Sequence, residues 1–329
     1  MSLSLHAPRF WFGPPSWQSA LLTPASWIWR AVSAWRARSA QPCRLGAKMV
    51  VVGNAVAGGA GKTPIAMAVA AALRARGVKA HMVSGGYGGT SRGPLLVDPA
   101  YHGFDRVGDE ALLLAKVAPS WIARKRGQAA RAAWGCGAQA VVLDDGLQHP
   151  GLRPDLALMV VDARQGLGND RVIPAGPLRE PFDQALARCH GVVLLGGDAT
   201  PALMRRLSAR PVLRAHLVPS HDAPDLHGLR VVAFAGIGRP QKFFDTCRQM
   251  GAEVVKECPY PDHHPYTAHD TFDLANLAAD LDAQLVTTEK DGIRLTPDLL
   301  DQALVLPMTV RWEEPEALDR LLDSLSLTR

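Results

Sequence analysis

The sequence predicts an α/β fold with a mainly parallel sheet and helices on both of its faces. Two observations lead to this prediction. A glycine-rich loop lies between a short apolar segment and an alanine-rich segment, as in strand–loop–helix sites that bind phosphate. Short apolar segments then alternate with helical ones along the first two-thirds of the chain, which is typical of parallel strands joined by crossover helices. The predicted strands cover residues 48–53, 80–84, 140–144, 157–162 and 191–195.

Length, composition and cysteine content indicate a globular protein with reduced thiols. The chain has 329 residues, which favours two domains over one. With 47% apolar and 20% charged residues, the composition is neither disordered nor collagen-like. The five cysteines show no C-x-x-C spacing, so we expect neither a disulfide framework nor a zinc site.

Basic residues are concentrated at the start of the chain. Eleven Lys and Arg precede Asp98, which is the first acidic residue. A positive N-terminal third favours anionic partners such as a phosphorylated substrate, an acidic membrane surface or nucleic acid. Because we find no RNA- or DNA-binding module, we expect no nucleic-acid partner, and no protein partner is indicated.

Residues 1–40 are predicted to form a helical segment rich in Trp and Arg. Five of the eight Trp residues fall in the first 35 positions. Thr23 and Pro24 predict the helix start, because Thr caps a helix and Pro suits its first position. Three arginines between positions 30 and 38 make the apolar run too short and too charged to cross a membrane. Two alternatives remain, a helix at the membrane surface and a helix packed on its own domain.

The loop "AGGAGKT" predicts a nucleotide site. Glycines let backbone N–H groups turn towards a phosphate, Lys62 would reach the outer phosphates, and Thr63 would offer its hydroxyl to Mg²⁺. The strict pattern G-x-x-x-x-G-K-[ST] has Gly where this chain has Val56, and the remaining G-G-x-G-K-T is typical of one branch of P-loop ATPases and GTPases. A glycine-rich turn without a ligand is the alternative. The predicted ATP-binding residues are Val56, Ala57, Gly58, Gly59, Ala60, Gly61, Lys62 and Thr63.

Two carboxylates are predicted to lie beside this loop. The segment "AVVLDDG" reads as a buried strand that ends in Asp144 and Asp145. Carboxylates in this place can hold Mg²⁺ or its water ligands, because that ion prefers hard oxygen ligands. After a phosphate loop in the same α/β unit, the two residues predict a metal site.

A P-loop core is predicted for residues 41–222 and a smaller α/β domain for residues 223–329, whose extreme C-terminal segment is allowed to pack back on the core. The linker-like stretch "VPSHDAPDLHG" separates the two. The segment "GIGRP" lacks the dinucleotide pattern, and "TTEKD" has its Lys one place late for the guanine-binding motif. We therefore expect no second nucleotide site and no guanine specificity.

Eight motifs together carry a resemblance to a known family. Because these motifs occur in the family's order along the chain, the sequence resembles the tetraacyldisaccharide 4′-kinases, the bacterial lipid A 4′-kinases. The resemblance implies transfer of the γ-phosphate of ATP, with Mg²⁺, to the 4′-hydroxyl of a tetraacyldisaccharide 1-phosphate, giving lipid IVA at the cytoplasmic face of the inner membrane. The motifs are "GNAVAGGAGKTP", "SGGYGG", "VGDEALLLA", "LDDGLQH", "IPAGPLREP", "FAGIGRPQKFF", "YPDHHPYT" and "TTEKD".

The resemblance also implies roles for acidic and histidine side chains. It makes Asp109 the catalytic base, whereas the residues alone favour a cap at the start of a helix, and both roles are compatible. His263 becomes the partner of Asp109, with His264 secondary. Since these residues fall in different predicted domains, closure of the two domains is expected to complete the site.

Further cleft residues follow from the same resemblance. It implies that Gln148 and Glu180 join Thr63 around Mg²⁺ and that Arg179 stabilises phosphate charge. Tyr87 lies in a glycine-rich turn after a predicted strand, which places it on the acceptor side of the cleft. Family members usually carry Arg where this chain has Gly86, so that arginine's role is lost or moved.

The leading hypothesis is therefore a lipid-sugar kinase that works at a membrane surface. A lipid acceptor favours the membrane-associated alternative for residues 1–40. The rival hypothesis is a nucleotide-hydrolysing switch or maturation ATPase or GTPase with the same loop and no lipid acceptor.

Overall fold

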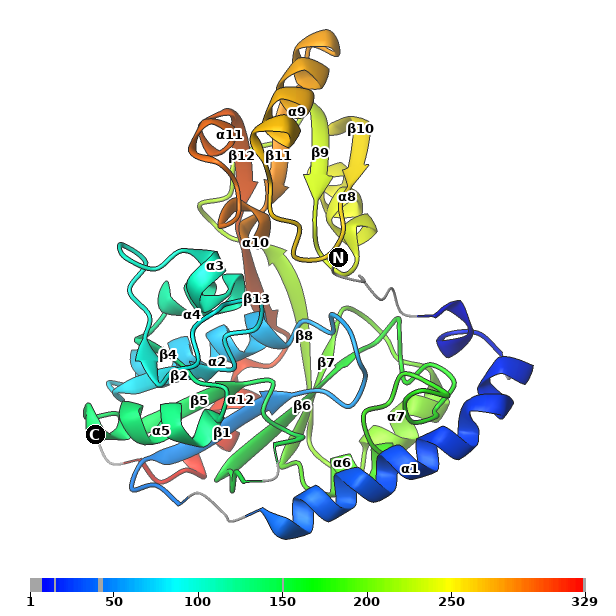
Figure 1. Ribbon diagram of the computed structural model, residues 1–329, viewed down its shortest axis with the longest axis vertical. Helices are drawn as coiled ribbons and strands as arrows, with labels where there is room; N and C mark the ends of the chain where they lie inside the picture. The colour runs from blue at the N-terminus through cyan, green and yellow to red at the C-terminus, as the bar shows by residue number, and fades with distance from the viewer. Residues whose placement is uncertain (1–7, 15, 41–43, 150, 328–329) are drawn as a thin grey trace.

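The computed structural model describes residues 8–14, 16–40, 44–149 and 151–327. These residues form two lobes, a larger one that contains the first two-thirds of the chain and a smaller one above it in Figure 1. The predicted α/β architecture with a mainly parallel sheet is confirmed. Cys43 lies outside the described residues.

The larger lobe is built on a nine-stranded sheet. All neighbouring strands are parallel except the pairs at its two edges, β13 with β8 and β3 with β4. Strand β1 lies at the centre of the sheet, so the glycine-rich loop emerges from its middle. In spatial order the strands are β13 (Met308–Trp312), β8 (Val212–Pro219), β7 (Gly191–Leu195), β6 (Leu156–Asp162), β1 (Lys48–Gly53), β5 (Ala140–Asp144), β2 (Ala80–Ser84), β4 (Ser120–Ile122) and β3 (Leu95–Leu96).

Helices cover both faces of this sheet because its strands are apolar on both sides. Val50 and Val52 of β1 pack in the cluster with Ile65 of α2, whereas Met49 and Val51 face the cluster that contains α5. Helices α6 and α7 belong to a third cluster with β6 and β7. The helices of this lobe that follow β1 are α2 (Lys62–Ala75), α3 (Phe104–Val107), α4 (Asp109–Ala115), α5 (Arg126–Gly135), α6 (Phe182–Ala187), α7 (Pro201–Leu207) and α12 (Pro315–Asp323).

The smaller lobe has a four-stranded parallel sheet between two helical layers. Val231 and Ala233 of β9 pack on the side of α8, and Val232 and Phe234 pack on the side of α9. This alternation follows from the two-residue period of a strand. In spatial order the strands are β10 (Glu253–Pro259), β9 (Arg230–Ala235), β11 (Gln284–Thr288) and β12 (Ala303–Leu306), and the helices are α8 (Pro240–Gln249), α9 (Ala268–Asp280), α10 (Glu289–Gly292) and α11 (Pro297–Gln302).

The chain passes between the lobes twice, as two antiparallel strands. Strand β8 leads out of the larger lobe and β13 leads back (Figure 1). Helix α12 then packs on the core of the larger lobe through Leu318 and Leu322. The four-stranded sheet therefore occupies residues 230–306, and the C-terminal segment belongs to the larger lobe.

The N-terminal helix begins earlier than the sequence predicts. A short 3₁₀ helix, η1 (Arg9–Trp11), precedes α1 (Trp17–Ser39), whose N-cap is Ser16. The predicted start at Thr23 and Pro24 is therefore wrong, because Pro24 lies inside the helix. Residues 1–7 and 15 of the predicted segment lie outside the described residues, and within the described ones no helix is long and apolar enough to cross a membrane.

We expect Leu322→Ala to lower the free energy of unfolding by about 2–4 kcal/mol, because a buried leucine side chain leaves a cavity in the main core. Urea denaturation followed by tryptophan fluorescence measures the change. Leu300→Ala, at a 44% exposed position of the smaller lobe, is the matched control and should change stability by less than about 1 kcal/mol. Equal losses in both variants would contradict the packing of α12 on the core.

Candidate functional site

The glycine-rich loop leaves the central strand and leads directly into α2. Gly58 has a φ of 111° and Gly61 a φ of 79°, in the left-handed region that favours glycine. A Cβ atom at Gly61 would also meet the side chain of Leu195, which would have to move to admit it. Helix α2 begins at Lys62, and its N-terminus carries the partial positive charge that attracts phosphate. The loop therefore offers an anion both backbone N–H groups and a helix dipole.

Val56 occupies the first glycine position of the strict loop pattern without a positive φ. Its backbone forms an antiparallel bridge with Leu178, and the N–H of Arg179 donates to the carbonyl of Ala55 (2.8 Å). Because Val56 is extended and buried in this pairing, the position does not need the conformational freedom of glycine. The departure from the strict pattern thus has a local structural reason.

Asp144 ends β5 next to the loop, opposite Val52 in the sheet register. Its Oδ2 accepts a hydrogen bond from Oγ1 of Thr63 (2.7 Å), and its Oδ1 is buried with no hydrogen-bond partner among the described residues. Burial, followed by the negative charge of Glu110, raises the pKa of Asp144 to about 7. A buried carboxylate oxygen with unused acceptor capacity, beside a hydroxyl, suits a hard cation.

Asp145 has the opposite electrostatic environment. Its Oδ1 lies 3.7 Å from Nζ of Lys62, and Nη1 of Arg179 donates to both of its oxygens (2.8 and 3.0 Å). Burial raises the pKa of Asp145, but the charges of Lys62 and Arg179 outweigh it and the net pKa is lowered. Asp145 is therefore a fixed anion that holds two cations at the loop.

Gln148 and Glu180 lie beside this cluster. Nε2 of Gln148 donates to Oε1 of Glu180 (3.1 Å) and to the carbonyl of Asn54 (2.9 Å), and Nη1 of Arg179 donates to Oε1 of Gln148 (3.3 Å). The described residues contain no group of three or more His, Cys, Asp or Glu that could hold a metal ion unaided. A cation here would need further oxygen ligands, which phosphates and water supply for Mg²⁺.

Asp109 and His263 meet across the two lobes. Asp109 is the first residue of α4 and only 3% exposed, and Nδ1 of His263 lies 2.9 Å from its Oδ2. The cap position belongs to Gly108, while Oδ1 of Asp109 accepts from the N–H of Glu110 (2.8 Å). Burial raises the pKa of Asp109, but the hydrogen bond from His263 and the charges of Lys290 and Arg294 leave it below its usual range.

Sequence reasoning missed the two cations beside Asp109. Nζ of Lys290 lies 4.0 Å from Oδ2 of Asp109, and Nε of the buried Arg294 lies 3.4 Å from the same oxygen. Both belong to "TTEKDGIR", whose first five residues were interpreted as one of the resemblance motifs and as a failed guanine motif, with no role assigned to either cation. The signal available in the sequence was a group of charges placed directly after a buried strand.

The smaller lobe also reaches the phosphate loop itself. Nη2 of Arg239 donates to the carbonyl of Gly59 (2.8 Å), and both Arg239 and Lys242 form ion pairs with Oδ2 of Asp162 at the end of β6. Burial raises the pKa of Asp162, but the hydrogen bond from Lys242 and the charge of Arg239 lower it overall. The turn that begins α8 therefore lies against the loop.

Tyr87 and His264 lie on different sides of His263. The Tyr87 ring is exposed and its centroid is 5.3 Å from that of His263, so this residue borders the cluster. His264 is not brought to Asp109, because its Nε2 faces Oδ2 of Asp270 (3.2 Å) and its ring packs against Tyr260.

Arg126 and His149 add polar groups that sequence reasoning did not single out. Nε of Arg126 and Nδ1 of His149 are buried without hydrogen-bond partners among the described residues. A Cβ at Gly85, in the turn that carries Tyr87, would lie 3.0 Å from Nη2 of Arg126. The guanidinium of Arg126 therefore lies beside that turn and near Asp145, whose pKa its charge lowers, and the same charge, after burial, lowers the pKa of His149.

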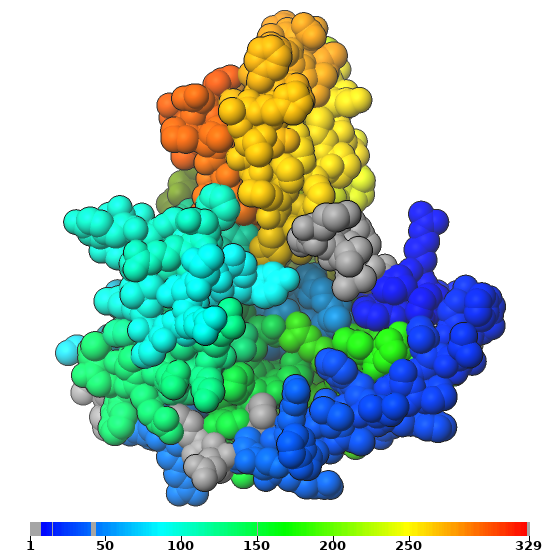
Figure 2. Space-filling model, viewed as in Figure 1, coloured from blue at the N-terminus to red at the C-terminus, as the bar shows by residue number. Residues whose placement is uncertain are grey.

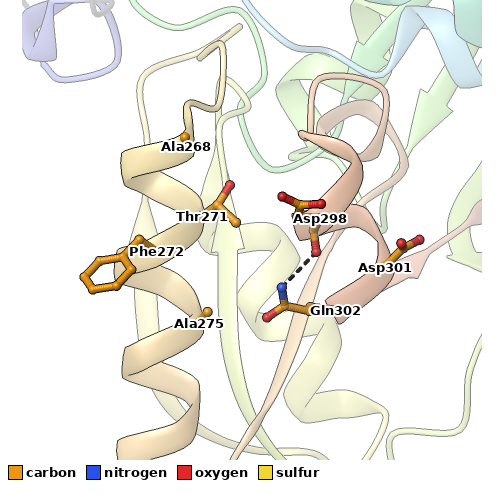
Figure 3. A pocket seen from close by; sticks show the side chains of 7 residues that line it. All are labelled: Ala268, Thr271, Phe272, Ala275, Asp298, Asp301 and Gln302. Carbon is orange, nitrogen blue, oxygen red and sulfur yellow. Dashed lines mark hydrogen bonds between the residues drawn. The ribbon is translucent and has the colours of Figure 1, made fainter.

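A hollow of about 510 Å³ lies away from this site, between α9 and α11 (Figure 3). Figure 3 shows Thr271 on the side of α9 that faces Asp298 and Gln302, whereas the ring of Phe272 extends from the far side of α9. No residue of the glycine-rich loop, and none of those around Asp144 or Asp109, lines this hollow, so it is separate from the candidate site.

Comparison with known proteins gives consistent matches over almost the whole chain. A family model described as tetraacyldisaccharide-1-P 4′-kinase (LpxK) matches residues 18–326. Proteins described as tetraacyldisaccharide 4′-kinase from Rhodospirillum centenum and Gluconacetobacter diazotrophicus are 51% and 48% identical, over 98% and 97% of this chain and 97% and 98% of their own length. The crystal structure of LpxK from Aquifex aeolicus in complex with ATP has the same fold, with a TM-score of 0.75 and 24% identity over 93% of this chain and 99% of that one.

Asp144→Asn should stabilise the nucleotide-free and metal-free protein more at pH 8 than at pH 5. Burial raises the folded-state pKa of Asp144 to about 7, above the ordinary value of 3.8 expected in the unfolded chain, so the folded state loses stability relative to the unfolded state as pH rises between these values. We expect the free energy of unfolding of the variant, relative to that of wild type, to increase by about 2–3 kcal/mol from pH 5 to pH 8. Urea denaturation at both pH values measures it, and Asp301→Asn, at an exposed position, is the control. A difference that does not change with pH would contradict the buried, neutral state of Asp144.

Proposed function

Since this chain belongs to the tetraacyldisaccharide 4′-kinase family, we propose that it transfers the γ-phosphate of ATP to the 4′-hydroxyl of a tetraacyldisaccharide 1-phosphate and so forms lipid IVA. The observation that carries this proposal is the meeting of Asp109 with His263 beside a phosphate loop, in a chain that matches the family from residue 18 to 326. The rival function, a nucleotide-hydrolysing switch with no lipid acceptor, is not favoured by this family membership.

The triphosphate binds at residues 56–63. Lys62 and the N-terminus of α2 attract its negative charge, and Arg179, held by Asp145, adds a second cation close by. Phosphoryl transfer requires little covalent chemistry from a protein, so these groups act by positioning and by stabilising charge. In this proposal the two cations move from Asp145 towards the phosphates when ATP binds.

The residues around Asp144 fit a magnesium ion. The unpartnered Oδ1 of Asp144 and the hydroxyl of Thr63 are hard oxygen donors at the end of the loop, with Asp145, Gln148 and Glu180 beside them. When bound, Mg²⁺ supplies positive charge that neutralises the phosphate oxygens. Ionisation of Asp144, with its raised pKa, is favoured by such a cation.

Asp109 aligns the acceptor hydroxyl and accepts its proton. Its carboxylate is kept ionised by His263, Lys290 and Arg294, and a buried carboxylate with a free lone pair is a suitable base. His263 holds Oδ2 through Nδ1 and thereby orients the group. Three of these four residues come from the smaller lobe, so we propose that the lobes close to complete the site, as expected from the sequence.

The acceptor sugar lies on the side of Tyr87. The exposed tyrosine ring next to His263 offers a surface for a sugar ring, and the unpartnered nitrogens of Arg126 and His149 offer polar contacts. Such contacts leave Asp109 between the acceptor and the phosphate loop.

Helix α1 has its polar face inside and its apolar face outside. Ser19 donates to the carbonyl of Ala175 (2.6 Å) and Ser26 to that of Val172 (2.7 Å), so its small hydroxyl residues face the protein. The opposite stripe has helical spacing and is exposed, with Trp17 at 73% and Trp35 at 66%. The other large apolar residues that α1 exposes are Leu21, Trp27, Ile28, Trp29 and Val32.

This arrangement supports docking of α1 on the cytoplasmic face of the inner membrane. A helix that served only packing would bury its apolar stripe, whereas Trp and Leu outside and Arg30, Arg36 and Arg38 exposed nearby suit an anionic lipid surface. Figure 2 shows the helix in blue along the larger lobe with its outer side uncovered. The lipid acceptor would then reach the cleft from the membrane to which the protein is docked.

The function is tested with γ-labelled ATP, supplied with and without the acylated disaccharide phosphate. We expect label in the lipid phase with wild-type protein, and a rate at least about 10²–10³-fold lower with Lys62→Ala, since it removes a positioned charge. Lys79→Ala, an exposed lysine at the far end of the same helix–loop unit, is the control and should keep full activity. Label that appears only as free phosphate, whether or not lipid is present, would support the nucleotide switch instead.

Membrane docking is tested with the double variant Leu21→Glu and Ile28→Glu. We expect its binding to vesicles of phosphatidylglycerol and phosphatidylethanolamine to fall at least about tenfold, because two exposed apolar side chains no longer enter the lipid. Sedimentation with the vesicles measures binding, and Leu229→Glu, an exposed leucine of the smaller lobe, is the control. Unchanged sedimentation of the double variant would exclude this face as the docking surface.

A further inference from the structure

The short helix α10 brings one ammonium group next to His263 and Asp109. Helix α10 follows β11 directly, and Thr288 caps it by accepting from the N–H of Asp291 (3.1 Å). Lys290 is its second residue, and Nζ of Lys290 lies 3.3 Å from Nε2 of His263. The same Nζ is 3.5 Å from Oδ1 of Asp262, 3.7 Å from Oε1 of Glu110 and 4.0 Å from Oδ2 of Asp109.

This contact determines which nitrogen of His263 carries a proton. An ammonium group has hydrogens to donate and no lone pair, so Nε2 must accept from it and must itself be unprotonated. Nδ1 then carries the only ring proton, and it donates to Oδ2 of Asp109 at 2.9 Å. Oδ1 of Asp262 is 3.8 Å from Nε2, beyond hydrogen-bond distance, and does not compete.

The rest of the cluster holds this arrangement in place. Arg294 is buried and donates through Nη2 to Oδ1 of Asp291 (2.7 Å) and to the carbonyl of Gly236 (2.9 Å). Its Nε donates to the carbonyl of Lys290 (3.4 Å) and lies 3.4 Å from Oδ2 of Asp109. Asp291 is completely buried and also accepts from the hydroxyl of Tyr266 (3.0 Å). The end of α10 is therefore anchored in its own lobe.

We propose that Lys290 is a positioning residue for phosphoryl transfer, which fixes His263 as the neutral Nδ1–H tautomer so that the imidazole donates to Asp109. This proposal rests on the function proposed above. Lys290 and His263 belong to the smaller lobe and Asp109 to the larger one. The Nδ1–H group of His263 can therefore donate to Asp109 only when the two lobes are in contact. Lys290 thereby connects lobe closure with the orientation and ionisation of the base.

The charges that face Asp109 come from three segments. Glu110 lies on its own helix, Asp262 and His263 lie on the segment between β10 and α9, and Lys290 and Arg294 lie on and after α10. Loss of Lys290 removes one of two full cations and leaves both neighbouring carboxylates. The pKa of Asp109, which the cations now hold low, must then rise.

The test compares Lys290→Met with Lys290→Arg in the full chain. For Lys290→Met we expect kcat to fall about tenfold or more, with the KM for ATP unchanged within about twofold, because the base and not the nucleotide is affected. As pH is lowered, kcat/KM for the acceptor should fall earlier in Lys290→Met than in wild type. The reason is that Asp109 in this variant becomes protonated at a higher pH. Lys290→Arg retains donors and charge and should restore most of the rate and the wild-type pH profile.

A second measurement reads the tautomer without any substrate. Nitrogen NMR of histidine-labelled protein, with the His263 signals assigned by their loss in His263→Gln, should show a protonated Nδ1 and a bare Nε2 in wild type. Lys290→Met should show a proton on Nε2 in part of the molecules, because no ammonium group then faces that nitrogen, while Nδ1 keeps the proton that it donates to Asp109. Lys116→Met is the matched control, because Lys116 joins α4 to Glu289 of α10 (2.8 Å) at the exposed edge of the same contact and leaves the cluster intact.

Each outcome decides the proposal. An Nε2 that stays unprotonated in Lys290→Met, together with a pH profile parallel to that of wild type, would overturn it, and so would failure of Lys290→Arg to restore the profile. Thermal unfolding of each variant separates misfolding from positioning, and Lys290→Gln, which removes the same charge with a polar side chain, replaces Lys290→Met if that variant is unstable. If wild-type protein fails to phosphorylate the lipid, the proposed function is wrong, whereas the NMR measurement still tests the role of Lys290.

Discussion

The structure depends on the cost of burying the carboxylate of Asp109. A buried anion is strongly unfavourable unless hydrogen bonds and opposite charges compensate for lost hydration. Here the larger lobe supplies the carboxylate and the smaller lobe supplies the imidazole and both cations. The two-stranded connection of β8 and β13 keeps the lobes in reach of one another, and α10 and the His263 segment place the compensating groups. The geometry around the proposed catalytic base and the contact between the lobes thus depend on the same interaction.

The adjacent carboxylates at the end of β5 show how neighbours in sequence acquire different properties. Asp144 points into the protein beside Thr63 and tends to remain protonated, whereas Asp145, at a φ of 57°, turns towards Lys62 and Arg179 and is an anion. The first has an oxygen without a hydrogen-bond partner among the described residues, which the proposed function assigns to a metal, and the second holds two cations at the loop, which in the same proposal a phosphate would attract. The positive φ of Asp145 therefore accompanies a difference in environment between two residues that are adjacent in sequence.

Helix α1 reverses the usual amphipathic order. Its serines bond to backbone carbonyls of residues 172 and 175, so polar contacts attach it to the protein, and its tryptophans remain exposed. The strip of the protein surface beneath it presents carbonyl groups, which apolar side chains could not satisfy. The same hydrogen bonds that secure the helix thereby aim its apolar face outwards.

Local patterns in the chain were sufficient for the alternating strands, the loop at Gly58–Lys62 and the pair Asp144 and Asp145, because these depend on residues close in sequence. The resemblance added Asp109 and His263, although 154 positions separate them. Lys290, Arg294, Arg239 and Arg126 could not be assigned in this way, nor could the return of β13 and α12 to the larger lobe or the inclusion of Pro24 in α1. An isolated charge or a proline looks the same in a sequence whether solvent or a distant segment surrounds it. Only folding brings a side chain into contact with the groups that set its ionisation, its tautomer and its neighbours, since those groups come from elements far along the chain.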